Sequence, residues 1–576
     1  MISMSLQPGH SSQILLVDEL LREIIRIVDE DPIERLSTLS RLARVCKGTS
    51  GPALDALWHT MYTTIPIFRQ ADNGFRFHQD SSIIKWPNGS ETCKTYSILY
   101  CPKPCEEAVW DDVLKYSSRV RILDHPTNAT QGRFYITLDR SAVKEICKSQ
   151  RMLFPNLEIL HWPLDGMNYN SSDIEPFLSP SIKEIHVHRS RHKIGDIFTE
   201  VHKHNLCNLE SIKISEQLIG MNCGIQKEVV KNSPRLHTYR NVNDCSIELW
   251  LSLAASSTLG DVLVTFPAYR QTPELPTSSI PVTPFPVLGK VSLAGHVDTL
   301  ISHIKPFKFP FLVNISLSIN NGPEWEDPPE DSVGELIDTL AERIPKEHVH
   351  TFNIYSYHVY EDRYNPIISP HVFDPLKAGF INMRVFRCNT DWKVYLDDAI
   401  LTELAIAWPK AIIIDFSPDS TSRVVYSVNQ ISVTLKGVLS VLRYCPDLKL
   451  LGLVLDADVS TLPQDIGDNE TTELQMLSLG PSVIHKDAIQ SVAQFLYRLT
   501  PRLEKLEAWM GKPVDDDEDY YGIPYRRRWR DVTLEIQKLR KDAGASKGTV
   551  EFPYATGTYL DAFDAIFAHQ RARLVF

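Results

Sequence analysis

Apolar residues recur at helical spacing near the start of the chain. Between residues 18 and 30, leucine, isoleucine and valine occupy positions 20, 21, 24, 25 and 28, on one broad face of a helix that begins at Asp18. A second helix is expected after Asp31-Pro32, because proline is tolerated in a first helical turn. Residues 48–51 break this pattern, and Pro52 is expected to open a third helix. The segment 14–64 is therefore predicted to be a three-helix domain.

This segment has more apolar residues than three short helices can bury among themselves, since small domains leave much of their surface exposed. The uncovered face is expected to need a partner.

The residues that match a known family are Leu16, Glu19-Leu20-Leu21, Ile24-Ile25, Leu39, Leu42, Val45-Cys46-Lys47 and Leu57-Trp58. With them, the segment resembles an F-box, the adaptor-binding module of SCF-type ubiquitin ligases. It looks most like the F-box families of fungi, in which the ending V-C-K-x-x-S-x-P-A-L-x-x-L-W is usual. The family usually has proline where this chain has Val17. The resemblance implies contact with a Skp-family adaptor through Leu16, Val17, Leu20, Leu21, Ile24, Ile25, Leu39, Leu42, Val45, Cys46, Leu57 and Trp58.

A different pattern repeats from about residue 110. Each copy has a proline or polar break, a leucine-like residue, two variable positions and an apolar-x-apolar strand. Clear copies are 154–162, 179–187 and 207–214, and others begin near 285, 309, 445, 474 and 501. Pro155 and Pro180 lie 25 residues apart, and Pro286 and Pro310 lie 24 apart. Leucine-rich repeats have periods of about 20–29 residues.

Helical patterns separate these strands at 333–340, 435–444 and 488–499. Strand and helix in alternation predict an α/β solenoid with a parallel β-sheet on its concave face. The pattern resembles the degenerate leucine-rich repeats of many F-box proteins, which implies an irregular horseshoe. The asparagine that usually closes each repeat is mostly absent.

The remaining segments are expected to surround this array. Residues 1–13 are predicted to be disordered, 65–109 an irregular connector, and 110–512 the repeats. Six prolines between 266 and 286 predict a projecting loop. Residues 513–576 are predicted to form an acidic and basic loop, followed by helices at 529–541 and 559–573 that cap the end of the solenoid.

Composition narrows the function classes. The chain has 576 residues and a formal net charge of −12, which argues against nucleic-acid binding. The sequence has no run of 18 apolar residues and no signal peptide. We therefore expect a cytoplasmic or nuclear protein that does not bind a membrane. The 10 cysteines are expected to be reduced thiols.

No catalytic, dinucleotide or phosphate-binding motif occurs, so no enzymatic activity and no cofactor are predicted. The cysteines of Cys-Pro-Lys-Pro-Cys at 101–105 lack the second close pair that a zinc site needs. His186 and His188 share one face of a predicted strand, with His192 nearby. These histidines could belong to a metal enzyme or a hydrolase, but we favour a role in contact with a partner protein.

The same alternation places a polar set on the concave sheet face, where a protein target is expected to bind. This set is His161, His186, His188, Ser211, Lys213, Ser292, Asn314, Ser316, Ser478, Lys505, Glu507 and Trp509, with Trp509 as the expected anchor.

These patterns predict a substrate-recognition subunit of an SCF-type ubiquitin ligase. The adaptor would join the chain to a cullin, and the repeats would hold a protein whose identity the sequence does not give. The alternative is an interaction scaffold in which the first helices only cap the solenoid, without a ligase.

Overall fold

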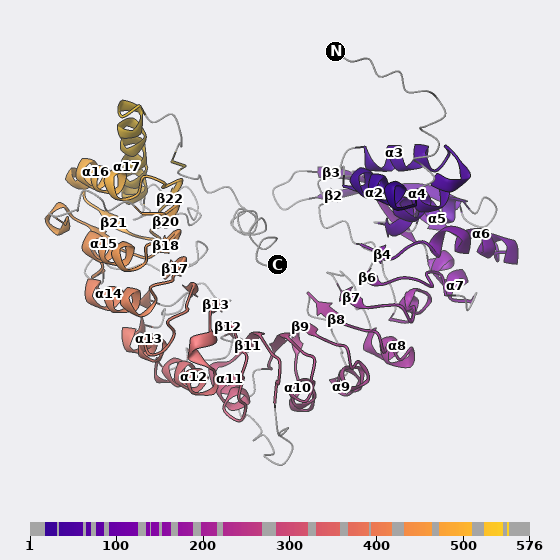
Figure 1. Cartoon of the computed structure of the whole chain (residues 1–576), viewed down its shortest axis with the longest axis horizontal. Coiled ribbons are helices and arrows are strands. Elements are labelled where there is room, and N and C mark those ends of the chain that lie inside the picture. The colour runs from indigo at the N-terminus through magenta and orange to yellow at the C-terminus, as the bar shows by residue number, and fades with distance from the viewer. Residues whose placement is uncertain are drawn as a thin grey trace. The chain divides into compact units, whose positions relative to one another are not determined.

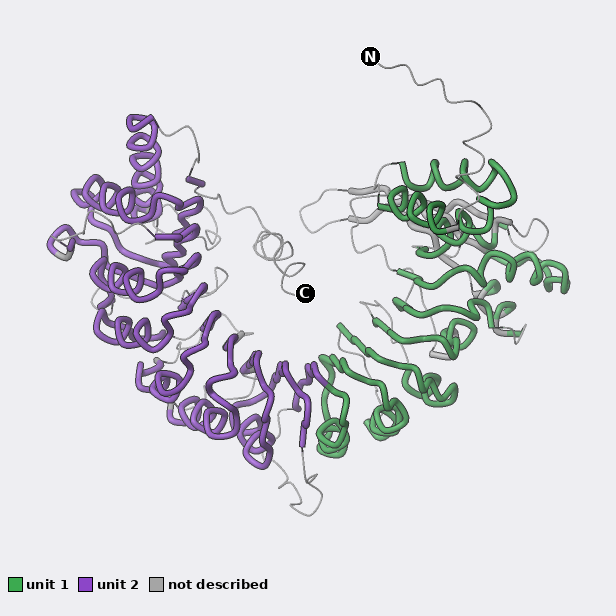
Figure 2. Tube along the Cα trace, in the orientation of Figure 1, with its two compact units in different colours: residues 1–259 green, residues 260–576 purple. Residues whose placement is uncertain are grey.

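The computed structural model describes residues 18–30, 34–61, 65–70, 76–85, 91–124, 134–138, 140–148, 152–162, 171–187, 197–215, 223–267, 284–320, 330–357, 367–390, 393–416, 431–463, 472–509, 523–544 and 550–551. The chain divides into two compact units, Met1–Leu259 and Gly260–Phe576, which are described in turn (Figure 2). The predictions of disorder at 1–13, of a helix at 559–573 and of a loop spanning 268–283 lie outside the described residues.

The first unit opens with the three predicted helices, α2 (Asp18–Asp29), α3 (Arg35–Leu42) and α4 (Lys47–His59). The third helix begins at Lys47 and contains Pro52, so the expected break at residues 48–51 was wrong. Thr49 is the reason: its hydroxyl accepts from the backbone N–H of Cys46 and donates to the carbonyl of Leu42. This capping box starts the helix one turn earlier, and Pro52 then removes a single backbone hydrogen bond.

Six parallel strands follow among the described residues of this unit, in the order β1-β4-β6-β7-β8-β9. Their bounds are β1 (Thr60–Met61), β4 (Ile122–Leu123), β6 (Ile159–Trp162), β7 (Glu184–Val187), β8 (Ser211–Ile214) and β9 (Thr238–Asp244). The connecting helices are α5 (Ile65–Gln70), α6 (Glu107–Ser117), α7 (Arg140–Lys148), the 3-10 helix η1 (Ser171–Phe177), α8 (Ile197–Lys203), α9 (Cys223–Asn232) and α10 (Ile247–Ala254).

Alternation along these strands separates two sheet faces. In β6, Leu160 and Trp162 are buried, whereas Ile159 and His161 are only half-buried. The buried positions are in register with those of β7 and β8, so they share one face of the sheet. Helices cover one face of this sheet (Figure 1), and burial against them assigns the buried positions to that face. We call the opposite side of each sheet the open face.

The connector is not irregular as predicted. It contains two ten-residue antiparallel strands, β2 (Arg76–Lys85) and β3 (Glu91–Tyr100). Strand β3 also pairs in parallel with β5 (Phe134–Leu138), which lies inside the range assigned to repeats. These three strands form a small sheet separate from the main one. The pairing of β3 with β5 joins segments that are distant in sequence, so it leaves no local signature.

The second unit contains nine parallel strands among its described residues, in the order β10-β11-β12-β13-β15-β17-β18-β20-β22. Their bounds are β10 (Asp261–Thr265), β11 (Lys290–Gly295), β12 (Asn314–Asn320), β13 (Thr351–Tyr357), β15 (Val385–Asn389), β17 (Ile413–Asp415), β18 (Leu450–Gly452), β20 (Met476–Ser478) and β22 (Lys505–Glu507). Short pairs form at β14 (Ile367–Ile368) with β16 (Lys393–Val394), and at β19 (Asp456–Ala457) with β21 (Val483–Ile484).

Helices of this unit cover one face of the sheet (Figure 1). They are α11 (Val297–Ile304), α12 (Glu330–Arg343), α13 (Asp374–Lys377), α14 (Asp398–Ala407), α15 (Leu435–Tyr444), α16 (Ile489–Leu499) and α17 (Ile523–Asp542), with the 3-10 helices η3 (Lys346–His348), η4 (Pro370–Phe373), η6 (Val459–Thr461) and η7 (Lys486–Ala488). Each predicted repeat copy ends in an observed strand, and α15 has the predicted bounds. The prediction of a parallel sheet with alternating helices is therefore confirmed.

The last strand of the sheet is covered in part. Helix α17 packs against α16, and Trp529 in α17 is fully buried. The backbone of Glu551 then bridges β22: its N–H donates to the carbonyl of Glu504, and its carbonyl accepts from Leu506. Helix α17 begins at Ile523, so the basic run 526–528 is helical. The prediction that this run belongs to a loop was wrong.

Candidate protein-binding surfaces

Helix α2 carries two apolar stripes. Leu21, Ile25 and Val28 face the other two helices, whereas Leu20 and Ile27 remain 49% and 58% exposed. Leu20 and Ile27 are seven residues apart and therefore lie on the same side of the helix. One stripe forms the core of the three helices, and the other is open to a partner.

The core of these helices is already closed. Leu21, Ile25, Leu39 and Ala53 are buried against one another, and Val28, Leu42, Ala43, Ala56 and Leu57 pack around them. Leu21, Ile25 and Leu39, which were predicted to contact a partner, lie inside the three-helix core, and their contact with a partner stays a prediction. Leu42 and Leu57 also serve this core.

Further exposed apolar side chains lie on or beside α3. Leu36 is 60% exposed and Val45 is 59% exposed. Cys46, the N-cap of α4, is exposed as well, and the hydrogen bond of its sulfur with the hydroxyl of Thr49 lowers the pKa of the thiol. Ile27 and Leu36 are not among the predicted adaptor residues, because that set was taken from the positions that match the F-box motif.

The other predicted adaptor residues have mixed placements. Leu16 and Val17 lie outside the described residues, and Ile24 is half-buried on α2. Trp58 is half-buried, and its ring lies 5.1 Å from the ring of Tyr116 in α6, centroid to centroid. Trp58 therefore joins α4 to the first repeat. Of the predicted set, Leu20, Val45 and Cys46 are open to a partner.

A depression of about 420 Å³ adjoins α2 and α4 within the first unit. Its rim includes Arg22, Arg26, Arg119 and Arg121. Arg26 pairs with Glu23 at 2.7 Å, and Arg119 pairs with Asp55, so much of this positive charge is balanced internally.

The open face of the first sheet carries a polar row across four strands and the residue that follows β4. His161, His186, Lys213 and Arg240 are in register on β6, β7, β8 and β9, and Asp124 directly follows β4. Asp124 Oδ1 lies 3.0 Å from His161 Nδ1, and the two imidazole rings are 4.3 Å apart. The sequence prediction that these side chains share one face is confirmed for His161, His186 and Lys213; His188 and His192 lie outside the described residues.

Glu184 lies beside this row on β7. Its Oε2 atom lies 3.0 Å from His186 Nε2 and 3.5 Å from Lys213 Nζ. The hydrogen bond with His186, together with the charge of Lys213, lowers the pKa of Glu184 to about 2. The row is thus a balanced network of charges, suited to a polar partner.

This network has no metal-binding geometry. Among the described residues, no group of three or more His, Cys, Asp or Glu side chains is placed to hold a metal ion. The sulfurs of Cys101 and Cys105 lie 3.4 Å apart and are not joined by a disulfide bond, and burial raises the pKa of Cys105 to about 12.

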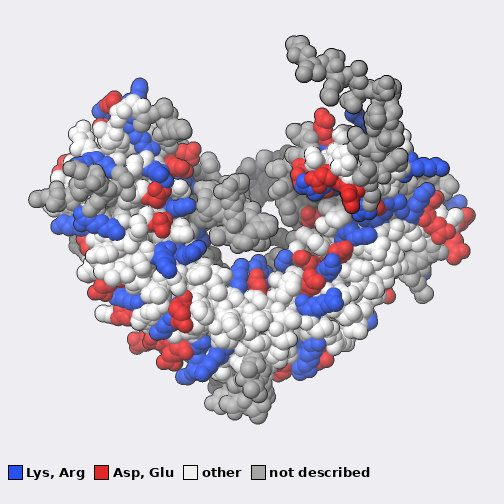
Figure 3. All heavy atoms as spheres, viewed as in Figure 1, with Lys and Arg blue, Asp and Glu red and all other residues white. Residues whose placement is uncertain are grey.

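The open face of the second sheet also carries a polar row, formed by Ser292, Ser316, Asn353, Arg387, Asp415, Ser478 and Glu507. Asn353 Nδ2 donates to Ser316 Oγ at 3.2 Å. Asn314 is half-buried in the adjacent row. On the face of the molecule seen in Figure 3, acidic and basic side chains are interspersed over each unit.

Four predicted target-binding residues are less open than expected. Ser211 and Ser478 are buried, and Glu507 is buried beside Lys505, with which it forms an ion pair. Trp509 is not a free anchor: its Nε1 donates to the carbonyl of Ser482 at 2.7 Å, and its ring stacks on Tyr525 of α17. Glu507 and Trp509 lie at the end of the sheet, where the packing of α17 could not be read from the sequence.

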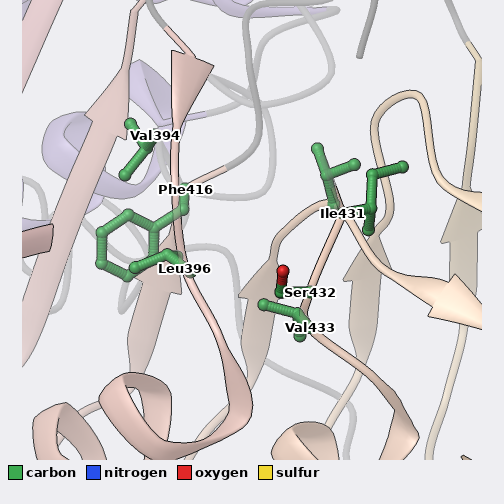
Figure 4. A pocket seen from close by; sticks show the side chains of 7 residues that line it. Val394, Leu396, Phe416, Ile431, Ser432 and Val433 are labelled. Atoms are coloured by element: carbon green, nitrogen blue, oxygen red, sulfur yellow. The ribbon is translucent and has the colours of Figure 1, made fainter. Parts of the chain in front are cut away.

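A small recess in the second unit is lined by Val394, Leu396, Phe416, Ile431, Ser432, Val433 and Val454 (Figure 4). Its free volume is about 10 Å³, roughly that of one water molecule. It is a packing gap and not a ligand site.

Among the described helices, none combines the length and apolar character that crossing a membrane requires. No protein-family model matches the chain, and the comparison with curated proteins found no match.

Proposed function

We propose that this protein is a substrate-recognition subunit of an SCF-type ubiquitin ligase. In this proposal, α2–α4 form an F-box that binds a Skp-family adaptor, and the strand–helix units form degenerate leucine-rich repeats that bind a protein target. The chain itself performs no covalent chemistry. Its contribution is proximity, since it would hold the target near a charged ubiquitin-conjugating enzyme.

The observation that supports the proposal most strongly is the exposed apolar side of α2–α4. The described residues include twelve large hydrophobic side chains that are exposed, and four of them, Leu20, Ile27, Leu36 and Val45, lie in this short segment. Their exposure is not a failure of the local core, because that core is formed by other residues. An apolar surface beside a complete core is typical of a protein interface.

The second candidate function is an interaction scaffold without a ligase. It is favoured by the junction between α4 and the sheet: β1 follows α4 directly and pairs with β4, and Trp58 packs on Tyr116. These contacts suit helices that cap the first sheet, whether or not they bind an adaptor.

Adaptor binding separates the two functions. The full chain should bind a purified Skp-family adaptor, and the double variant Leu20→Asp/Ile27→Asp should weaken binding at least about 30-fold, as expected when two interface anchors are lost. Isothermal titration calorimetry measures the affinity. Both side chains lie outside the local core, so the melting temperature should change little. Ile406→Asp, at an exposed apolar position on α14, is the matched control and should bind normally.

A footprint on Cys46 locates the interface independently. Iodoacetamide should alkylate Cys46 readily in the free chain, because its thiol is exposed and has a lowered pKa. The adaptor should protect Cys46 and leave the exposed Cys207 reactive. A folded chain that binds no adaptor, or a complex with Cys46 unprotected, would favour the scaffold.

A further inference from the structure

Two cysteines meet in the loop that joins β3 to α6 in the first unit. The loop contains Cys-Pro-Lys-Pro-Cys at residues 101–105, and the sulfur atoms of Cys101 and Cys105 lie 3.4 Å apart. A disulfide bond is about 2.05 Å long, so the two sulfurs need to approach by roughly 1.4 Å to form one. Both side chains are half-buried and so partly open to solvent, unlike those of Cys388 and Cys445, which are buried.

The loop holds the two thiols side by side. Its two prolines fix the backbone φ angles on both sides of Lys103. The backbone N–H of Cys101 donates to Ser141 Oγ at 3.3 Å. The backbone N–H of Cys105 donates to Glu145 Oε1 at 3.2 Å, so α7 anchors both ends of the loop. Little conformational freedom therefore remains to be lost when the sulfurs join, and each thiol is present at a high effective concentration for the other.

The surroundings give the two thiols different roles. The S–H group of Cys101 donates to the carbonyl of Lys103 at 2.8 Å, so the Cys101 sulfur is placed to accept the S–H group of Cys105. Burial, together with this contact, raises the pKa of Cys105 to about 12, so this thiol keeps its proton at neutral pH. A thiol reacts as a nucleophile through its ionised form, and attack on an oxidant therefore begins at Cys101.

A structural metal does not account for the pair. A structural zinc site takes four ligands, and in the part of the chain that the structure describes, no third His, Cys, Asp or Glu side chain is placed to join these two sulfurs. Two adjacent thiols in a constrained loop are instead the arrangement that thiol–disulfide exchange requires.

We propose that Cys101 and Cys105 form a reversible dithiol–disulfide site that reacts with a low-molecular-weight disulfide such as oxidised glutathione. The Cys101 thiol loses its proton, and its sulfur attacks one sulfur of the oxidant. The S–S bond of the oxidant breaks, one half stays on Cys101, and the other half leaves as a thiol with that proton. The Cys105 sulfur then attacks the Cys101 sulfur and displaces the second half, which leaves with the proton of Cys105. The pair loses two electrons and two protons, and the oxidant gains them.

The new bond would tie the end of β3 to the start of α6. Strand β3 belongs to the small sheet, and α6 carries Tyr116, whose ring packs on Trp58 of α4. Oxidation would therefore stiffen the link between the small sheet and the helix that contacts the N-terminal helices. This site does not depend on the proposed ligase function.

Equilibration of the full chain with mixtures of reduced and oxidised glutathione tests the site. Acid quenching, alkylation of the remaining thiols and peptide mass spectrometry measure the products. Residues 95–115 form one tryptic peptide, because the Lys103–Pro104 bond resists trypsin, and Cys101 and Cys105 are its only cysteines. The peptide should become lighter by two hydrogen atoms, whereas the exposed Cys207 should carry glutathione at the same ratios. A peptide that keeps both thiols, or carries only glutathione, would overturn the proposal.

Single variants test the order of attack. Cys105→Ser should stop with glutathione on Cys101. Cys101→Ser should react at least about fivefold more slowly, because burial still keeps Cys105 protonated. A faster reaction at Cys105 would show that the assigned order is wrong.

The exposed Pro102 tests the constraint of the loop. Pro102→Gly frees the backbone beside Cys101 and leaves the tryptic peptide intact, and it should need a roughly fivefold more oxidising glutathione mixture to form the bond. Equal mixtures for the variant and the wild type would contradict a loop that holds the thiols ready. In the wild type, oxidation should slow hydrogen exchange at the start of α6 at least about threefold and leave α9 unchanged.

Discussion

On the open sheet face of the first unit, neighbouring side chains lower the pKa of the Glu184 carboxyl group. It is held between His186 and Lys213, on two neighbouring strands, and its side chain is 30% exposed. The network fixes the orientation of His186 and neutralises charge that a partner would otherwise have to desolvate. Glu184 and His186 are two residues apart on β7, so the strand itself places them side by side, whereas only the register between β7 and β8 brings Lys213 close to Glu184.

The lowered pKa of Glu184 predicts a pH-dependent contribution to stability. Its pKa falls from 4.5 to about 2 on folding, so the ionised form stabilises the folded state. The contribution should be complete above about pH 4.5 and lost as the pH falls through about 2. Allowing for partial exposure, Glu184→Gln should lower the free energy of unfolding by roughly 1–2 kcal/mol at pH 7.

Urea denaturation from pH 7 to pH 2 measures this effect, and the difference between the wild type and Glu184→Gln should vanish near pH 2. Asp112→Asn, at an exposed position on α6, is the control and should change stability by less than about 0.5 kcal/mol. A pH-independent difference for Glu184→Gln would mean that the lost contact, and not ionisation, determines its effect.

At the scale of elements, the N-terminal helices show how a single amphipathic helix can serve two surfaces. The stripe Leu21, Ile25 and Val28 closes the local core, and Leu20 with Ile27 stays exposed, one position away around the helix. The sequence showed a face broader than the local core needs. It could not divide that face, because the division depends on how α3 and α4 pack against α2.

Two leucines on α3 provide a direct test of this division. Leu39 is fully buried, so Leu39→Ala should lower the free energy of unfolding by about 2–5 kcal/mol. Leu36 is exposed, and Leu36→Ala should change the free energy of unfolding by less than about 0.5 kcal/mol. Thermal and urea unfolding of the two variants measure both effects. Equal destabilisation would show that Leu36 is also enclosed, which would weaken the proposed adaptor surface.

At the scale of the molecule, the last strand of the parallel sheet in the second unit forms a sheet edge that needs to be covered. An open edge exposes unpaired backbone groups that can pair with another chain. Helix α17 and the bridge at Glu551 cover part of that edge. The indoles of Trp509 and Trp529 both donate to the carbonyl of Ser482, at 2.7 and 3.1 Å, so they attach α17 and the residues after β22 to the turn between β20 and β21.

Removal of one indole should loosen the cap selectively. Trp529 is fully buried, and Trp529→Ala should destabilise this region by about 3–5 kcal/mol. Hydrogen exchange should rise first in α17, β20 and β22, while β6 to β8 in the other unit keep their protection. The exposed Leu534 of α17, replaced by alanine, is the matched control. Uniform loss of protection in both units would contradict a local capping role.

The sequence by itself determined the alternation of strand and helix, the helical first segment, and which positions of a strand point to the same face. These features follow from local periodicity: apolar residues 3.6 apart form a helical stripe, and residues two apart share a strand face. The predicted copies 154–162, 179–187 and 207–214 each end in an observed strand for this reason.

Only the tertiary structure decided which apolar residues close the core, which remain exposed and which polar residues become enclosed. Leu21 and Leu20 are adjacent and chemically identical, yet one is buried and the other exposed. The sequence predicts that Glu507 and Trp509 lie on an open surface. In the structure, Trp509 stacks on Tyr525 of α17, and Glu507 is buried in an ion pair with Lys505. Strand β5 likewise pairs with β3, which is distant from it in sequence. Burial and strand pairing depend on neighbours that are distant in sequence, and a local sequence pattern cannot predict those contacts.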